Sequence, residues 1–292
     1  MRFGSPLPTR WAGHELAWGA RTYIMGVLNI TPDSFSGDGL APDGLATDAV
    51  VRRALALARQ MVADGAGLID VGGESTRPAT VQAPPLDVAA ERARVIPVIA
   101  TLAAALPSHI IISVDTSKAR VAEAALDAGA SLVNDVWGLR HDTAMAALIA
   151  AREVPVVLMS NLREQPRRDA LGDVLRQLAG SVELALAAGI PWERLILDPG
   201  IGFGLTAEEN LTVLRHLDAL AALGRPLLVG TSRKSTIGKV LDGAPESDRL
   251  EGTAATVALA IAQGADIVRV HDVREMARVA RMSDAIVRGW PR

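Results

Sequence analysis

Eight short apolar runs alternate with long alanine- and leucine-rich segments along most of this 292-residue chain. The runs are rich in β-branched residues and predict strands; they read TYIMGVLN, GLIDVGG, HIIISVD, SLVND, VPVVLMS, RLILDPG, PLLVG and ADIVRVH. The segments between them have helical periodicity and cover about residues 47–64, 87–106, 118–128, 142–151, 170–188, 207–222, 249–263 and 272–289. Eight strand–helix units predict an α/β fold with a single (β/α)8 TIM barrel. Two doubly wound domains are the alternative, but they need a long crossover or linker near the middle, and the sequence has none.

Three of the predicted strands follow the same short motif, a glycine and then an alanine: DGAGLIDV, AGASLVND and QGADIVRV. A glycine at this place is typical of a helix C-cap, where the backbone turns into the left-handed region before the next strand begins. The motif therefore predicts repeated local chemistry and does not by itself show a duplicated sequence.

Composition excludes several classes of protein. Hydrophobic residues make up 49% of the chain, which is enough for a large core. The formal net charge of -3 argues against a bulk nucleic-acid binder. No cysteine is present, which excludes disulfides, thiolate metal sites and cysteine nucleophiles. The first residues lack an apolar signal region and no run of about 18 apolar residues occurs, so we expect a soluble cytoplasmic protein without a membrane partner.

Polar side chains end most of the predicted strands. They are Asn29, Asp115, Asn134 and Asp198, with Arg269 and His271 on the last strand. In a (β/α)8 barrel the carboxyl ends of all strands converge on one mouth, where polar residues bind ligand or act in catalysis. Asp and Asn are also common helix N-caps, but six such residues together favour a ligand site. Asp70 precedes the end of its strand, and its role stays open between a site residue and a structural one.

Four loops carry the remaining polar groups, at residues 29–39, 72–80, 197–204 and 229–238. Phe203 lies in a glycine-rich turn, and an aromatic side chain there favours contact with a flat ligand. The last loop, VGTSRKSTIG, leads through Lys234 and Ser235 into a predicted short helix. Cations and backbone N–H groups at a helix N-terminus predict an anion site.

Seven motifs resemble the dihydropteroate synthase family in their order and spacing. They are MGVLNITPDSFSGDG, IDVGGESTRP, SVDTSK, NDVWGL, LDPGIGFG, GTSRKSTIG and VRVHDV. The likeness runs from about Arg21 to Val287, which assigns residues 21–292 to the pterin-binding barrel and residues 1–20 to an N-terminal extension. Members of this family join 6-hydroxymethyl-7,8-dihydropterin diphosphate to p-aminobenzoate, release pyrophosphate, and are the targets of sulfonamides.

The resemblance implies a role for each candidate residue. The pterin would be held by Asp115, Asn134, Asp198 and Lys234. The diphosphate would be held by Asn29, Arg77, Arg269 and His271, with Mg²⁺ coordinated near Asn29. The p-aminobenzoate site would be lined by Thr76, Phe203, Lys234 and Ser235, and Met159 keeps the family's place among the substrate-binding residues.

The mechanism that the resemblance implies needs no nucleophilic side chain. Pyrophosphate departs, and the arylamine attacks the resulting pterin methylene cation, which Asp33 is a candidate to stabilise. The loops at 29–39 and 72–80 are expected to close over the site. The resemblance also implies a homodimer, formed through helices near the end of the chain.

Two departures from the family pattern stand out. The first loop reads SGDG instead of SDGG, which displaces Asp38 by one position, and Ser160 replaces the usual histidine after the fifth strand. Two alternatives to an active synthase remain: a pterin-dependent methyltransferase domain and a catalytically silent pterin-binding paralogue. The methyltransferase would need neither the TSRKS loop nor the Arg269–His271 pair, both of which suit a diphosphate leaving group.

Overall fold

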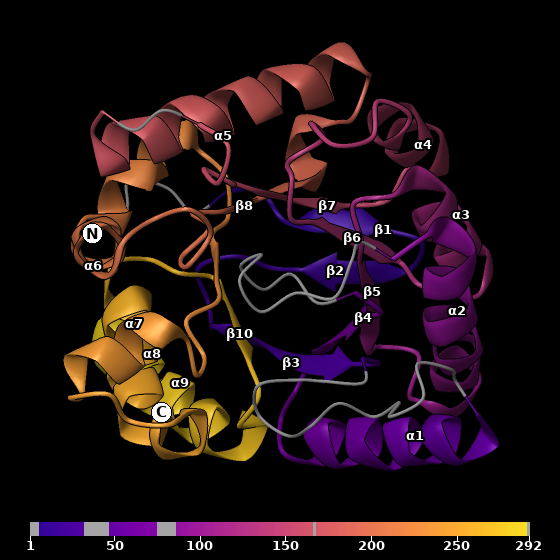
Figure 1. Cartoon of the computed structure of the whole chain (residues 1–292), viewed down its shortest axis with the longest axis horizontal. Coiled ribbons are helices and arrows are strands. Elements are labelled where there is room, and N and C mark those ends of the chain that lie inside the picture. The colour runs from indigo at the N-terminus through magenta and orange to yellow at the C-terminus, as the bar shows by residue number, and fades with distance from the viewer. Residues whose placement is uncertain (1–5, 32–46, 75–85, 166–167, 291–292) are drawn as a thin grey trace.

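Eight parallel strands form a closed barrel in the computed structural model, which describes residues 6–31, 47–74, 86–165 and 168–290 (Figure 1). The strands are β3 (Tyr23–Asn29), β4 (Leu68–Gly72), β5 (Ile111–Asp115), β6 (Leu132–Asp135), β7 (Val156–Met159), β8 (Leu195–Asp198), β9 (Leu228–Val229) and β10 (Ile267–Val270). Their order is β8-β7-β6-β5-β4-β3-β10-β9, and a parallel bridge from Leu197 to Leu227 joins the two ends of this order. The (β/α)8 barrel predicted from the sequence is therefore confirmed.

Helices surround these strands and follow each of them in the chain (Figure 1). They are α1 (Asp48–Ala63), α2 (Val88–Ala105), α3 (Ala119–Asp127), α4 (Met145–Arg152), α5 (Ala170–Ala187), α6 (Ala207–Arg215), α7 (Ser235–Val240), α8 (Leu250–Ala262) and α9 (Val273–Val287). The helix predicted at 207–222 is instead α6 followed by the 3₁₀ helix η3 (Leu217–Leu223). Leu217 and Leu220 are both fully buried, and the period of three in a 3₁₀ helix puts residues i and i+3 on one side.

The glycines before the strands adopt the predicted C-cap conformation. Gly65 has φ +111° and Gly129 has φ +108°, so both occupy backbone conformations that favour glycine. Each follows a helix, α1 or α3, and directly precedes a strand segment. The helix-to-strand turn is thus encoded locally, three residues before β4 and β6 begin.

A two-stranded hairpin packs against the barrel at the end opposite the mouth. It consists of β1 (Thr9–Trp11) and β2 (His14–Leu16). The Trp11 indole donates to the carbonyl of Ser131, just before β6, at 2.7 Å, and the Thr9 hydroxyl donates to the carbonyl of Glu193, just before β8, at 2.6 Å. Trp11 and Leu16 belong to the main hydrophobic core. The described part of the N-terminal extension therefore caps the amino ends of the strands.

None of the helices in the described ranges combines the length and the apolar character that crossing a membrane requires.

Candidate active site

A pocket that opens to solvent lies at the carboxyl ends of the strands. Its walls are Asp115, Asn134, Val136, Met159, Asp198, Phe203, Gly230, Ser232, Lys234, Arg269 and His271. Eight of the residues singled out in the sequence are among them: Asp115, Asn134, Met159, Asp198, Phe203, Lys234, Arg269 and His271. The barrel brings them together because β5, β6, β7, β8 and β10 all end at this mouth.

Arg269 joins two carboxylates at the centre of this pocket. Its Nε donates to Oδ2 of Asp70 at 2.6 Å, and its Nη2 donates to Oδ2 of Asp115 at 2.8 Å. The Asn134 carboxamide also donates to Oδ2 of Asp70, at 2.9 Å. Asp70 is fully buried, so it belongs to the site and orients both Arg269 and Asn134. The sequence left the role of Asp70 open; the signal that could have included it is a carboxylate in the middle of an apolar strand, which needs buried partners.

Burial shapes the ionisation of the two pocket carboxylates that face the open space. It raises the pKa of Asp115 to about 7, with Arg269 acting in the opposite direction. It raises the pKa of Asp198 to about 6, against the charge of Lys234 and a 2.7 Å hydrogen bond from the backbone N–H of Gly200. Both groups are ionised at slightly alkaline pH and are poised to accept N–H donors from a ligand.

Lys234 and Phe203 form the opposite wall. Lys234 is the N-cap residue of α7, and its ammonium group donates to the carbonyl of Ile201. Burial lowers the pKa of Lys234 to about 8, although Asp198 favours its charged form. The Phe203 ring lies 4.5 Å from the Lys234 ammonium and 4.5 Å from the Arg163 guanidinium carbon, measured to the ring centroid. The glycine-rich turn thus presents a half-buried aromatic ring that two cations already contact.

The loop before α7 is held by Arg233, not by the lysine beside it. Arg233 has φ +59°, and its guanidinium donates to Asp272 at 2.9 and 2.5 Å. Arg249 donates to the carbonyl of Arg233 at 2.7 Å. These bonds fix the turn that places Ser232 beside the last strand, where its hydroxyl lies 3.0 Å from Nδ1 of His271. Ser235 is exposed and begins α7.

Asn29 ends β3 at the same mouth, opposite Gly72 in the register with β4. A Cβ added to Gly72 would lie 3.6 Å from Oδ1 of Asn29 and 3.6 Å from Cβ of Asp115. Because Gly72 has no side chain, the backbone of β4 passes between Asn29, the predicted metal ligand, and Asp115, a predicted pterin ligand. Asp33, Asp38, Thr76 and Arg77 lie outside the described residues, as do the parts of both loops expected to close, and those roles stay predictions.

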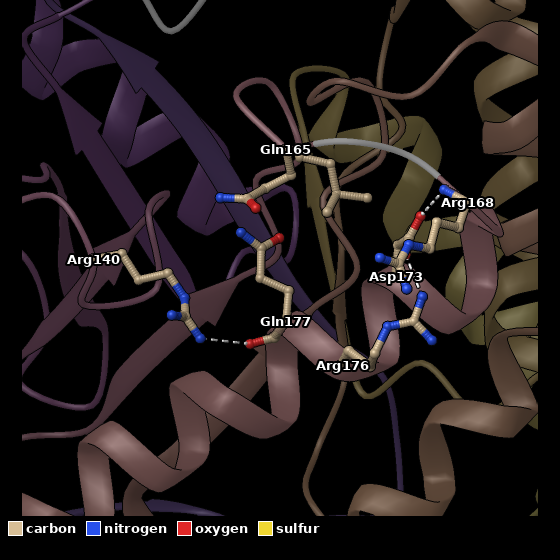
Figure 2. Close-up of a pocket in the computed structure, with 7 residues that line it drawn as sticks. Arg140, Gln165, Arg168, Asp173, Arg176 and Gln177 are labelled. Carbon is tan, nitrogen blue, oxygen red and sulfur yellow. Dashed lines mark hydrogen bonds and ion pairs between the residues drawn. The ribbon is translucent and has the colours of Figure 1, made fainter.

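Ser160, the departure from the family pattern, is engaged with α5. Its hydroxyl donates to the Gln177 carboxamide oxygen at 2.8 Å, and the Gln177 amide donates to the carbonyl of Asn161 at 2.8 Å. Gln177 also lines a second pocket behind this loop, with Arg140, Leu162, Gln165, Arg168, Asp173 and Arg176 (Figure 2). There Arg140 donates to the Gln177 carbonyl and Arg176 pairs with Asp173. We interpret these contacts as hydrogen bonds that hold the segment after β7 against α5. Ser160 is not among the residues that line the main pocket.

The raised pKa of Asp198 predicts that its ionised carboxylate lowers the free energy of unfolding at alkaline pH. Its pKa is about 6 in the folded protein against 3.8 ordinarily, so its favourable contribution is complete below about pH 4 and is lost as the pH rises through 6. Asp198→Asn should therefore increase the free energy of unfolding at pH 8 by about 1–3 kcal/mol, because an amide oxygen can still accept from Gly200. Urea unfolding at pH 8 and pH 5 measures this. A variant that is less stable than the parent at pH 8 would contradict the assignment.

Comparison with known proteins places this geometry in context. A family profile described as "Pterin binding enzyme" matches residues 25–271. Dihydropteroate synthase of Bacillus subtilis is 49% identical over 272 residues, covering 93% of this chain and 91% of the relative. Dihydropteroate synthase of Clostridium difficile, solved in the presence of pteroic acid, has a TM-score of 0.85 at 48% identity, covering 94% of this chain and 99% of its own. The Xanthomonas albilineans enzyme, solved with 4-aminobenzoic acid, has a TM-score of 0.87 at 39% identity, covering 99% and 100%.

Proposed function

This chain belongs to the family of pterin-binding enzymes, and from that premise we propose that it is a dihydropteroate synthase. The reaction joins 6-hydroxymethyl-7,8-dihydropterin diphosphate to p-aminobenzoate and releases pyrophosphate. One observation carries the proposal: a single pocket holds Asp115, Asn134, Asp198 and Lys234, which suit a pterin, beside Arg269 and His271, which suit a diphosphate. A pyrophosphate-release assay with both substrates tests it.

The pterin half of the site is built from neighbouring strand ends. Asp115 and Asn134 are register partners on β5 and β6, and Asp198 ends β8 on the same mouth. The edge of a pterin presents an array of N–H donors, and an ionised carboxylate accepts two of them at once. The buried position of Asp198, 7% exposed, strengthens such bonds because little water competes for them.

The diphosphate half is cationic. Arg269 uses Nε and Nη2 for the two aspartates, and we assign its remaining amino group, Nη1, to the leaving diphosphate. The Ser232 hydroxyl lies 3.0 Å from Nδ1 of His271, and we assign the other ring nitrogen, Nε2, to the same diphosphate. Fixed N–H donors of this kind stabilise the charge that develops on a leaving group, and they need no rearrangement during the reaction.

The residues present fit a magnesium ion that is held mainly by the substrate. In the described ranges, no group of three or more His, Cys, Asp or Glu residues could hold a metal. Asn29 offers a carboxamide oxygen at the mouth, and Mg²⁺ commonly takes one or two protein oxygens together with phosphate oxygens and water. When bound there, Mg²⁺ would neutralise part of the diphosphate charge. Magnesium dependence and a cytoplasmic location remain predictions.

The exposed apolar residues of α8 and α9 suit a homodimer. Leu259 is 65% exposed, Met282 62% and Ile286 72%, and these two helices pack against each other. Exposed apolar side chains on two helices that pack together suit an interaction surface. Ile286→Glu should therefore convert a dimer of about 61 kDa, twice the 30.6 kDa chain, into a monomer in sedimentation equilibrium. A parent protein that sediments as a monomer at micromolar concentration would contradict the dimer.

A further inference from the structure

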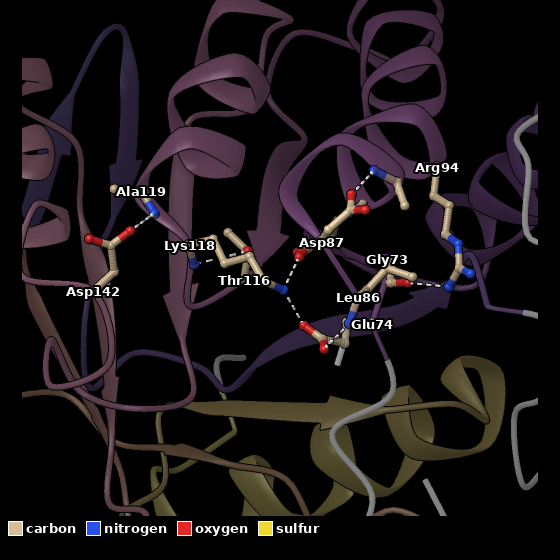
Figure 3. Close-up of polar contacts among 11 residues, drawn as sticks. Gly73, Glu74, Leu86, Asp87, Arg94, Thr116, Lys118, Ala119 and Asp142 are labelled. Carbon is tan, nitrogen blue, oxygen red and sulfur yellow. Dashed lines mark hydrogen bonds and ion pairs between the residues drawn. The ribbon is translucent and has the colours of Figure 1, made fainter. Parts of the chain in front are cut away.

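A half-buried lysine joins two carboxylates behind the mouth of the barrel. Lys118, just before α3, donates to Oε2 of Glu91 at 2.5 Å and to Oε2 of Glu74 (Figure 3). Glu91 lies in α2 with a side chain that is 1% exposed, and Glu74 follows β4 by two residues. Burial would lower the pKa of Lys118, but the hydrogen bonds to Glu74 and Glu91 outweigh it and raise that pKa. The cation is therefore permanent at any physiological pH.

Glu74 uses its second oxygen for a different purpose. Its Oε1 accepts from the backbone N–H of Leu86 at 2.9 Å (Figure 3). Residues 74 and 86 bracket the segment 75–85, which carries Thr76 and Arg77. A single carboxylate thus ties together the two ends of this segment and also attaches them, through Lys118, to the β5–α3 connection.

The backbone next to Glu74 is fixed as well. The carbonyl of Gly73 accepts from Nη1 of Arg94 at 2.9 Å. A Cβ added to Gly73 would lie 2.7 Å from Cγ1 of Val95 and 3.2 Å from Cγ of Glu91, so the backbone lies directly on α2. At the other end, Leu86 is followed by Asp87, which caps α2 by accepting from the backbone N–H of Ala90 at 2.7 Å. The two ends therefore rest on rigid elements.

We infer that Glu74 is a positioning residue for the reaction: it fixes residues 74 and 86, the two described ends of the segment whose sequence carries Thr76 and Arg77, against the barrel. The inference rests on the proposed function, together with the roles in p-aminobenzoate and diphosphate binding that the family resemblance implies for Thr76 and Arg77. A carboxylate is required because both oxygens accept hydrogen bonds, one from an ammonium and one from an amide. A glutamine has one acceptor oxygen and one NH₂ donor, so in either orientation it turns a donor toward Lys118 or Leu86.

The test uses two variants, Glu74→Gln and Glu74→Ala. Steady-state kinetics should show the KM for p-aminobenzoate raised and kcat lowered, with kcat/KM reduced about 10–100-fold, because a displacement of about 1 Å at a reacting group has an effect of this size. The Kd for the pterin alone, measured by calorimetry, should stay within twofold of the parent, since Asp115, Asn134 and Asp198 lie on strands. The matched control is Glu15→Gln, which removes the exposed Arg10–Glu15 pair at the opposite end of the barrel, and its kinetics should be unchanged.

Two results would overturn the inference. One is a Glu74→Ala enzyme whose KM for p-aminobenzoate and kcat both lie within twofold of the parent. The other is a parallel loss of pterin affinity and thermal stability, which would make Glu74 a general structural residue. Activity of the parent protein is measured first; its absence would count against the proposed function, whereas an active parent and a Glu74→Ala variant with unchanged kinetics would count against this inference alone.

Discussion

Arg269→Ala should lower the free energy of unfolding at pH 8 by about 3–5 kcal/mol, because it leaves two buried carboxylates without their cation. The side chains of Asp70 and Asp115 are 0% and 10% exposed, and both bond directly to this guanidinium. The same change should abolish turnover and weaken binding of the pterin diphosphate more than binding of the pterin alcohol. Urea unfolding measures the first effect and calorimetric titration of the two ligands measures the second.

The pH dependence of this effect identifies its cause. The pKa of Asp115 is already about 7 with Arg269 present, and removing the arginine raises it further. A carboxyl whose folded-state pKa exceeds its ordinary value loses its stabilising contribution as the pH rises through that pKa. The deficit of Arg269→Ala should therefore shrink between pH 8 and pH 5. Arg152→Ala is the control: it breaks an exposed pair with Asp127 and should cost less than about 1 kcal/mol. A deficit that is constant with pH would contradict the electrostatic explanation.

Asp115→Asn should abolish detectable pterin binding while the fold stays intact. The substitution keeps the size of the side chain but replaces an acceptor-only carboxylate by a group that is half donor. The lost bonds are charge-assisted, each worth about 1.5–3 kcal/mol, and two of them amount to a 10²-fold or larger loss of affinity. Arg269 keeps its bond to Asp70 in this variant. Calorimetric titration with the pterin at pH 8 is the measurement.

The control for this prediction is Asp127→Asn, the same chemical change on an exposed residue of α3. It should leave pterin affinity unchanged. If Asp115→Asn binds the pterin as the parent does, Asp115 is a strand-end residue whose function is to hold Arg269, and the assignment of the pterin to β5 is wrong.

The strands and helices could be predicted from the sequence because their signals are local. Apolar β-branched runs and the glycines at 65 and 129 specify where each unit turns, and the barrel follows from their number. The break at His216 could not be foreseen, because α6 and η3 share one apolar pattern and differ only in how tightly the backbone winds. The hairpin at Thr9–Leu16 also escaped prediction, because its two strands have three residues each and depend on bonds to Ser131 and Glu193, more than 100 residues away.

Most of the site residues could be predicted because they are polar and end a strand. In a (β/α)8 barrel the carboxyl ends of all strands meet at the mouth that holds the active site. Asp70 does not end its strand, and it belongs to the site because it accepts a hydrogen bond from Arg269, 199 residues further along the chain. Ser160 was recognised as a substitution, but its partner Gln177 is a helix residue with no special sequence context. Long-range pairs of this kind are specified by packing, which a single sequence does not display.

We expect the chain to catalyse the synthesis of dihydropteroate at this mouth. The most direct measurement incubates the purified protein with 6-hydroxymethyl-7,8-dihydropterin diphosphate, p-aminobenzoate and Mg²⁺ and follows pyrophosphate and dihydropteroate together. We predict that the two products appear in equal amounts, that omission of p-aminobenzoate stops both, and that removal of Mg²⁺ with a chelator lowers the rate. A folded protein that binds the pterin diphosphate but forms neither product would contradict the claim and indicate a catalytically silent pterin-binding paralogue or a pterin-dependent methyltransferase domain.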